Sequence, residues 1–131
     1  DFVHKLDSVS GIKFYIQSYP EWLYAAHLGG RDAGTSYYDD KASWYKENSD
    51  SISHPVKQKK PNALGVYDMV GNVSEWTISG PDPFLFVMDG SYETEKENCK
   101  IGASDFYHAD IQVASTGLRL VWYPESPLQY E

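Results

Sequence analysis

The fold of this chain is decided by the stretch Pro61-Asn62-Ala63-Leu64-Gly65-Val66-Tyr67-Asp68-Met69-Val70-Gly71-Asn72-Val73-Ser74-Glu75-Trp76. Pro61-Asn62 and Gly71-Asn72 are turn formers, because proline fixes φ and because Asn and Gly accept left-handed backbone geometry. The segment between these turns is rich in apolar side chains that need a core to face: Leu64, Val66, Tyr67, Met69 and Val70. The stretch therefore predicts two turns on either side of a packed segment.

The second turn leads into a predicted strand. Residues 73–78, Val-Ser-Glu-Trp-Thr-Ile, alternate between apolar and polar side chains, as a half-buried strand does. Glu75 lies among positions that this strand would bury. A buried carboxylate is costly unless a cation or several hydrogen-bond donors meet it, so we expect Glu75 to have such a partner.

Upstream of this stretch the sequence predicts two short helices and a strand. Apolar residues in 2–10 are spaced as in an amphipathic helix, and Gly11 would end it. Residues 12–16 predict a strand. Ser18 with Glu21 three residues later forms a capping box for a second helix, which Gly29-Gly30 would end. From residue 31 to residue 60 we expect a long polar loop region held by its aromatic side chains.

Downstream, residues 79–83 predict a hard turn and the apolar run 84–88 predicts a central strand. Residues 93–98 form a charged loop. Residues 105–112 predict a second loop, rich in side chains suited to recognition, and residues 117–123 a closing strand. We expect a single domain over residues 1–123 and a loose tail over residues 124–131.

Composition excludes several classes of function. The 131 residues carry a formal net charge of −8, which predicts no binding of nucleic acid, because little here would displace counterions from phosphates. No apolar run is long enough for a transmembrane segment. The four histidines show no helical ligand spacing, and the chain has one cysteine, Cys99. The aromatic fraction of 15% includes eleven tyrosines, which suit either a small β-rich core or a binding surface.

The central stretch resembles the signature of the formylglycine-generating enzyme (sulfatase-modifying factor) family, and three further segments match that family in its order. These are Ser18-Tyr19-Pro20-Glu21-Trp22-Leu23-Tyr24-Ala25-Ala26, Asp89-Gly90-Ser91-Tyr92 and Thr116-Gly117-Leu118-Arg119-Leu120-Val121. The family pattern at the second segment is Gly-Gly-Ser-Trp/Tyr. The chain resembles a divergent and shortened member, whose domain would extend upstream of residue 1.

The resemblance implies an α+β fold of the C-type lectin-like type. It comprises two short helices packed on a twisted antiparallel sheet, with a high loop content. It also implies an activity to be tested against the residues, namely copper-dependent oxidation of a substrate cysteine to formylglycine. That reaction needs two thiolates, because Cu(I) selects soft ligands, and Cys99 alone, just past the position of the pair in our alignment, cannot supply them. We therefore predict that the chain is not an enzyme and requires no cofactor.

The resemblance further implies a structural calcium ion on the second turn. Its ligands would be the backbone carbonyls of Val70, Gly71 and Val73 with the Glu75 carboxylate. An equally weighted alternative is that Glu75 accepts backbone donors or pairs with Arg119. Asp39, Asp40 and Asp50 could also ligate a hard cation, but a solvated acidic loop is the simpler interpretation.

The function that remains is ligand binding, because folds of this kind display irregular loops from a compact base. The partner would be a protein or a glycan, and the resemblance includes variable receptors diversified by retroelements. The candidate ligand-binding residues are Tyr92, Asp105, Phe106, Tyr107, His108, Asp110 and Gln112. The alternative is a structural component of a bacterial envelope or secretion complex. Family resemblance places either at the cell surface or in the periplasm.

Overall fold

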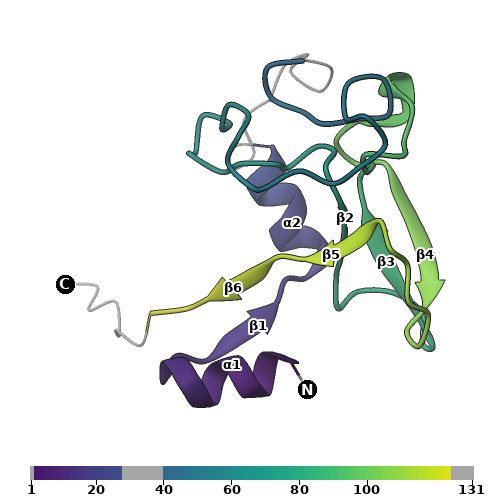
Figure 1. Ribbon diagram of the computed structural model, residues 1–131. Helices are drawn as coiled ribbons and strands as arrows, with labels where there is room; N and C mark the ends of the chain where they lie inside the picture. The colour runs from purple at the N-terminus through teal and green to yellow at the C-terminus, as the bar shows by residue number, and fades with distance from the viewer. Residues whose placement is uncertain (1, 28–39, 125–131) are drawn as a thin grey trace.

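The computed structural model describes residues 2–27 and 40–124 (Figure 1). Within these ranges the elements follow in the order α1 (Phe2–Ser10), β1 (Phe14–Ile16), α2 (Tyr19–Ala26), β2 (Ser74–Trp76), β3 (Phe84–Met88), the 3₁₀ helix η2 (Lys96–Asn98), β4 (Ser104–His108), β5 (Thr116–Leu118) and β6 (Leu120–Trp122). The predicted helix end at Gly29-Gly30 and most of the predicted tail lie outside the described residues, and so do Tyr37, Tyr38 and Asp39.

Both predicted helices form where their local signals place them. Gly11 adopts φ +70° and its N–H donates to the Asp7 carbonyl, which ends α1. Ser18 and Glu21 make the reciprocal capping box of α2, with Pro in the first turn. No helix in the described ranges has the length and apolar character needed to cross a bilayer.

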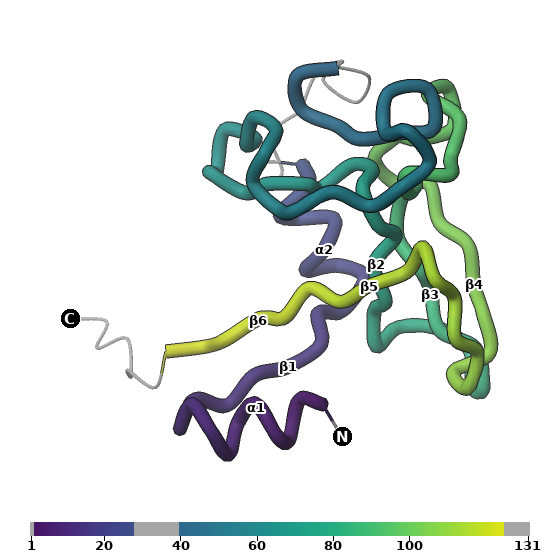
Figure 2. Tube along the Cα trace, in the orientation of Figure 1, coloured from purple at the N-terminus to yellow at the C-terminus, as the bar shows by residue number. Residues whose placement is uncertain are grey.

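The strands form two sheets. A four-stranded sheet has the order β4-β3-β2-β5, and β1 pairs with β6 in a separate antiparallel ribbon. The predicted antiparallel arrangement holds for β2–β3 and β3–β4, whereas β2 and β5 are parallel. The reason is the crossover at residues 109–115, which carries the chain from one edge of the sheet to the other (Figure 2).

The predicted closing strand is divided in two. β5 pairs with β2 in the four-stranded sheet, and β6 pairs with β1 in the ribbon. Arg119 lies between them, at the point where the chain leaves one sheet for the other. This residue therefore belongs to neither strand and is placed where both sheets meet.

The four-stranded sheet has two different faces, because side chains alternate along each strand. Met88 and Phe86 face α2, where Trp22, Ala26, Met69 and Met88 form the main buried cluster. We call the opposite side the outer face. It carries Ser74 and Trp76 of β2, Val87 of β3, Asp105 and Tyr107 of β4, and Thr116 of β5.

The central stretch ties the loops to this frame. The Asn62 side chain donates to the Ala25 carbonyl at the end of α2 and accepts from the amides of Leu64 and Val66, so the first predicted turn is confirmed. Gly71 has φ +80°, and a Cβ there would lie 2.1 Å from the Trp44 carbonyl oxygen. Only glycine fits this position. Met69 and Val70 are buried as predicted, whereas Leu64 is half exposed.

The strand over residues 73–78 is shorter than predicted, at Ser74–Trp76, and it buries Glu75 rather than Trp76. Glu75 is 6% exposed and points toward α2. The identity of its partners therefore determines how the buried charge is stabilised and whether the predicted calcium site can exist.

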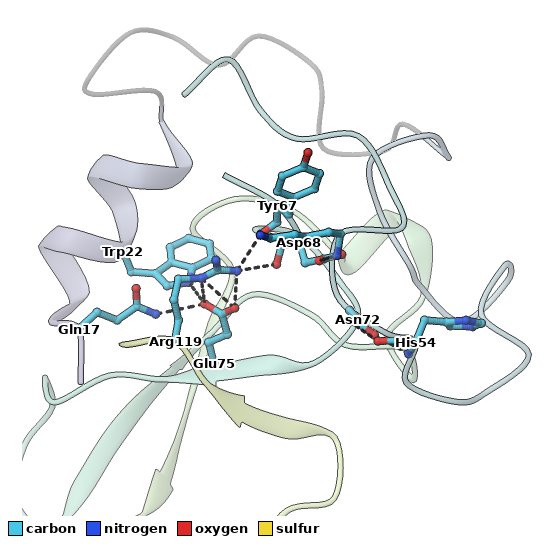
Figure 3. A network of polar contacts seen from close by, with 9 residues as sticks. Gln17, Trp22, His54, Tyr67, Asp68, Asn72, Glu75 and Arg119 are labelled. Carbon is cyan, nitrogen blue, oxygen red and sulfur yellow. Dashed lines mark hydrogen bonds and ion pairs between the residues drawn. The ribbon is translucent and has the colours of Figure 1, made fainter. Parts of the chain in front are cut away.

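The Glu75 carboxylate is met by a set of donors from distant segments (Figure 3). Arg119 Nη2 lies 2.7 Å from Oε1 and Arg119 Nε lies 2.9 Å from Oε2. The Trp22 indole and the Gln17 amide donate to Oε2 at 2.8 and 3.1 Å. The guanidinium also donates to the carbonyls of Tyr67 and Asp68. The expected partner of Glu75 is thus a cation and two neutral donors, all from the protein.

Candidate functional site

The strand β4 separates the predicted ligand-binding residues onto two faces. Residues 105–112 were predicted as one loop, but Ser104–His108 pairs along its whole length with β3, so that part of the prediction was wrong. A half-exposed edge strand explains the error, because its polar and aromatic side chains resemble those of a loop. Asp105 and Tyr107 point to the outer face, and Phe106 and His108 to the face that carries Phe84 and Phe86.

A pocket of about 310 Å³ lies on the outer face. Strands β2 to β5 supply part of its wall, and the turn after β3 supplies most of the rest. Its lining is largely polar: Ser74, Asp89, Ser91, Glu93, Thr94, Asn98, Ser104, Asp105, Tyr107, Ser115 and Thr116, together with Val87, Gly90 and Ala103. Two of the seven predicted ligand-binding residues, Asp105 and Tyr107, therefore share one concave site.

The other five predicted residues lie outside this lining. Tyr92 is in the turn beside the pocket, where its backbone bonds with the Asn72 carbonyl and the Ser49 hydroxyl. Phe106 packs edge-on against Phe84 and Phe86 on the opposite face. The remaining three, His108, Asp110 and Gln112, lie at the end of β4 and on the crossover.

Asp89 is the feature of the pocket that sequence reasoning missed. Its Oδ1 accepts the Gly90 amide at 2.7 Å, whereas Oδ2 is buried without a hydrogen-bond partner. The residue is 9% exposed and has φ 57°, a conformation that Asp tolerates better than most side chains. The available signal was a carboxylate at the first position of Asp89-Gly90-Ser91, where the resembling pattern has glycine.

Burial raises the pKa of Asp89 from its ordinary value of 3.8 to about 8. The negative charge of Glu75 acts in the same direction, and the amides of Gly90 and, more weakly, Lys100 oppose it. At neutral pH the group is therefore largely a neutral carboxylic acid at the wall of a polar pocket.

Cys99 lies behind the same turn. The thiol is fully buried, and burial raises its pKa to about 12, so it is protonated at neutral pH. A Cβ added to Gly90 would come within 3 Å of both the Thr94 side chain and Cys99 Sγ, so both side chains pack closely against this turn. Among residues 2–27 and 40–124 no three His, Cys, Asp or Glu side chains are placed to hold a metal ion together.

The raised pKa of Asp89 predicts how the stability of the protein depends on pH. The folded protein keeps a proton on Asp89 up to about pH 8, whereas the unfolded chain releases this proton above about pH 4. The contribution of Asp89 to the free energy of unfolding therefore decreases as pH rises from about 4 to about 8, and it is constant at higher pH. In urea unfolding across this range, wild type should lose stability relative to Asp89→Asn. A difference between the two proteins that stays constant with pH would contradict the assignment.

The predicted calcium ligands lie at a second pocket, of about 220 Å³, whose lining includes Gly71, Val73, Glu75 and Arg119. Val70 is buried beside it. Both oxygens of Glu75 already accept N–H donors, and the guanidinium provides the positive charge that a cation would bring. This donor set does not fit a calcium ion on the Glu75 carboxylate, and the geometry supports pairing with Arg119 instead.

A calcium titration tests the set Val70, Gly71, Val73 and Glu75 directly. Because Arg119 occupies the carboxylate, we expect the melting temperature to be the same in calcium and in a chelator, by differential scanning fluorimetry. A rise in melting temperature with calcium that disappears in Glu75→Gln would restore the calcium site.

Comparison with proteins of known structure identifies the scaffold. Treponema denticola variable protein 1 superposes with a TM-score of 0.72 at 28% identity, over 83% of this chain and 47% of that protein. PvdO from Pseudomonas aeruginosa superposes with a TM-score of 0.77 at 20% identity, over 91% of this chain and 56% of that protein. These likenesses confirm the predicted α+β fold of the C-type lectin-like, formylglycine-generating-enzyme type.

Sequence comparison gives the same result. The chaperone protein LppX of Paenibacillus barcinonensis is 35% identical over 43% of this chain and 28% of its own length. The chain thus spans between 28% and 56% of the lengths of these three relatives. The profile of the sulfatase-modifying factor enzyme 1-like domain matches residues 13–124. Because this match extends over most of the chain, the protein belongs to the family of sulfatase-modifying factor enzyme 1-like domains.

Proposed function

We propose that this protein is a non-catalytic binding module whose ligand, a protein or a glycan, occupies the pocket on the outer face of the sheet. The observation that carries the proposal is the pocket itself, which is concave, polar and open to a ligand beside the exposed Asp105. Its walls combine regular strands with one irregular turn, an arrangement that holds the site rigid while its side chains can vary.

The non-catalytic part of the proposal is supported by the sulfur chemistry. A copper site of the family's kind needs two thiolates. Cys99 is the one cysteine of the chain, and its thiol is buried and protonated. The residues present do not fit a copper ion of this kind.

Similarity to a variable protein of Treponema denticola supports a receptor whose recognition residues change between copies. Tyr107 and Asp105 on β4 and the exposed Gln112 on the crossover are the positions at which such change would alter the ligand while leaving the core intact. A receptor of this kind would act at the cell surface or in the periplasm. The metal-free and cofactor-free protein is the form that we propose to be active.

A second candidate is a structural or assembly role in a bacterial envelope complex. It is favoured by the relative named as a chaperone protein and by the aromatic side chains of Phe84 and Phe106, which are 38% and 56% exposed at the outermost strand pair. This role would use the face opposite to the pocket.

The two candidates are separated by neighbouring substitutions on one strand. Tyr107→Ala changes the pocket and Phe106→Ala changes the opposite face, and both side chains are partly exposed, so folding should survive each change. On glycan and protein arrays we expect ligand binding by wild type to fall at least tenfold in Tyr107→Ala and to be retained in Phe106→Ala. Loss in Phe106→Ala alone would favour the assembly role, and no ligand at all would contradict the binding module.

A further inference from the structure

The chemistry of the pocket lining specifies a class of ligand. Among the residues that the structure describes, three carboxyl groups line it, those of Asp89, Glu93 and Asp105, and no Lys, Arg or His side chain does. Most other lining residues are serines and threonines, whose hydroxyl oxygens accept hydrogen bonds. A site of this composition disfavours anions and favours a positively charged donor.

Asp89 is the strongest single indication that a donor is missing. The side chain is more than nine-tenths buried. Oδ1 accepts the Gly90 amide, and Oδ2 is closed to solvent and makes no hydrogen bond of ordinary geometry to the residues that the structure describes. Buried polar atoms in native proteins nearly always have a partner, and this one, in a residue that lines the pocket, would gain one from a ligand that enters it. Exposed Asp105 and Glu93 add negative charge at the entrance without needing a partner themselves.

We propose that this pocket binds a primary ammonium group of the ligand, with Asp89 as its counter-charge. The inference rests on the proposed binding function and names the chemistry of that same site. Because Asp89 has a single free oxygen, it offers one acceptor rather than the paired acceptors that a guanidinium fork matches. An ammonium group is a compact charge with three donors, which one carboxylate oxygen and neighbouring hydroxyls can satisfy.

The groups that face Asp89 are consistent with this assignment. They are the Glu93 and Asp105 carboxylates of the pocket, the Cys99 thiol and the amides of Gly90 and Lys100. The Glu75 carboxylate acts through its charge from the other face of the sheet. None of these groups carries a positive charge, and the Arg119 guanidinium is already paired with Glu75, so none of them supplies a cation to Asp89. Binding of an ammonium group would convert the neutral acid to a carboxylate and release one proton to solvent.

The test uses small amines in place of the unidentified ligand. Nα-acetyl-lysine amide, its Nε-acetylated counterpart and 6-amino-6-deoxyglucose, an amino sugar with a more basic amine, are titrated into the whole chain at about pH 8.5, above the pKa of Asp89 and below the ~10.4 of a lysine amine. Backbone amide shifts in a ¹H–¹⁵N spectrum report where each probe binds. We expect saturable shifts around Asp89 and Thr94 with the charged amines and none with the Nε-acetylated probe.

Three single substitutions test the role of Asp89 and provide its controls. Asp89→Asn keeps an acceptor for the Gly90 amide and tolerates the left-handed backbone, so it should fold and bind at least tenfold more weakly. Asp105→Asn, at an exposed position, should weaken binding by roughly threefold. Glu97→Gln removes the same charge outside the pocket lining and should bind as wild type does. Below pH 8, affinity should decrease by up to about tenfold per pH unit.

The outcomes separate the two proposals. Saturation by the lysine probe alone indicates a peptide ligand, saturation by 6-amino-6-deoxyglucose alone an amino sugar, and saturation by both an ammonium group irrespective of its carrier. Equal binding by wild type and Asp89→Asn, or no saturable shift with either amine, overturns the ammonium site. An array ligand that is lost in Tyr107→Ala but retained in Asp89→Asn would overturn it while leaving the binding module in place.

Discussion

The buried ion pair of Glu75 and Arg119 is the interaction on which the rest of this structure depends. Glu75 comes from β2 in the four-stranded sheet, and Arg119 from the junction between the two sheets. Through Trp22 the same carboxylate reaches α2, and through the guanidinium it reaches the carbonyls of the central loop. A buried pair is strongly destabilising when one partner is removed, because the other charge is left without compensation. This geometry therefore makes four separate segments interdependent.

The pair also explains how a chain with so much irregular backbone presents a defined site. Loops from residues 40–72 gather at one end of the molecule (Figure 1), where the Asn62 side chain donates to the Ala25 carbonyl of α2 and the Asn72 side chain bonds to both backbone groups of His54. The outer face of the sheet is on the other side of β2 from the ion pair. Stability and recognition are thus assigned to opposite faces of the same strands, so that side chains such as Tyr107 can change without disturbing the core.

Much of the frame could be predicted because its signals are local. The capping box of Ser18 and Glu21, the helix end at Gly11 and the apolar run of β3 each follow from a few adjacent residues. The errors occur where contacts between segments that are distant in sequence determine the structure. Strand β4 was taken for a loop because its burial depends on β3, and the parallel pairing of β5 depends on the crossover. Asp89 is charged in sequence and becomes a buried acid only through its tertiary surroundings.

The candidate site also combines features that residue type predicts with features that depend on tertiary contacts. Tyr107 and Asp105 were predicted from residue type, whereas the alternation that turns Phe106 and His108 away could be known only once β4 was a strand. For Glu75, the sequence required a partner but could not choose between calcium and Arg119. The choice depends on the position of residue 119 between two sheets, which no local pattern records.

A double-mutant cycle on Glu75 and Arg119 tests the central claim most directly. Urea unfolding of wild type, Glu75→Gln, Arg119→Gln and the double variant gives the coupling energy between the two side chains. Since Glu75 is 6% exposed and the Arg119 side chain 25% exposed, we predict a coupling of about 2 kcal/mol or more. The exposed pair of Lys46 and Glu95 should give less than about 1 kcal/mol in a parallel cycle. Equal and small couplings for both pairs would contradict the account.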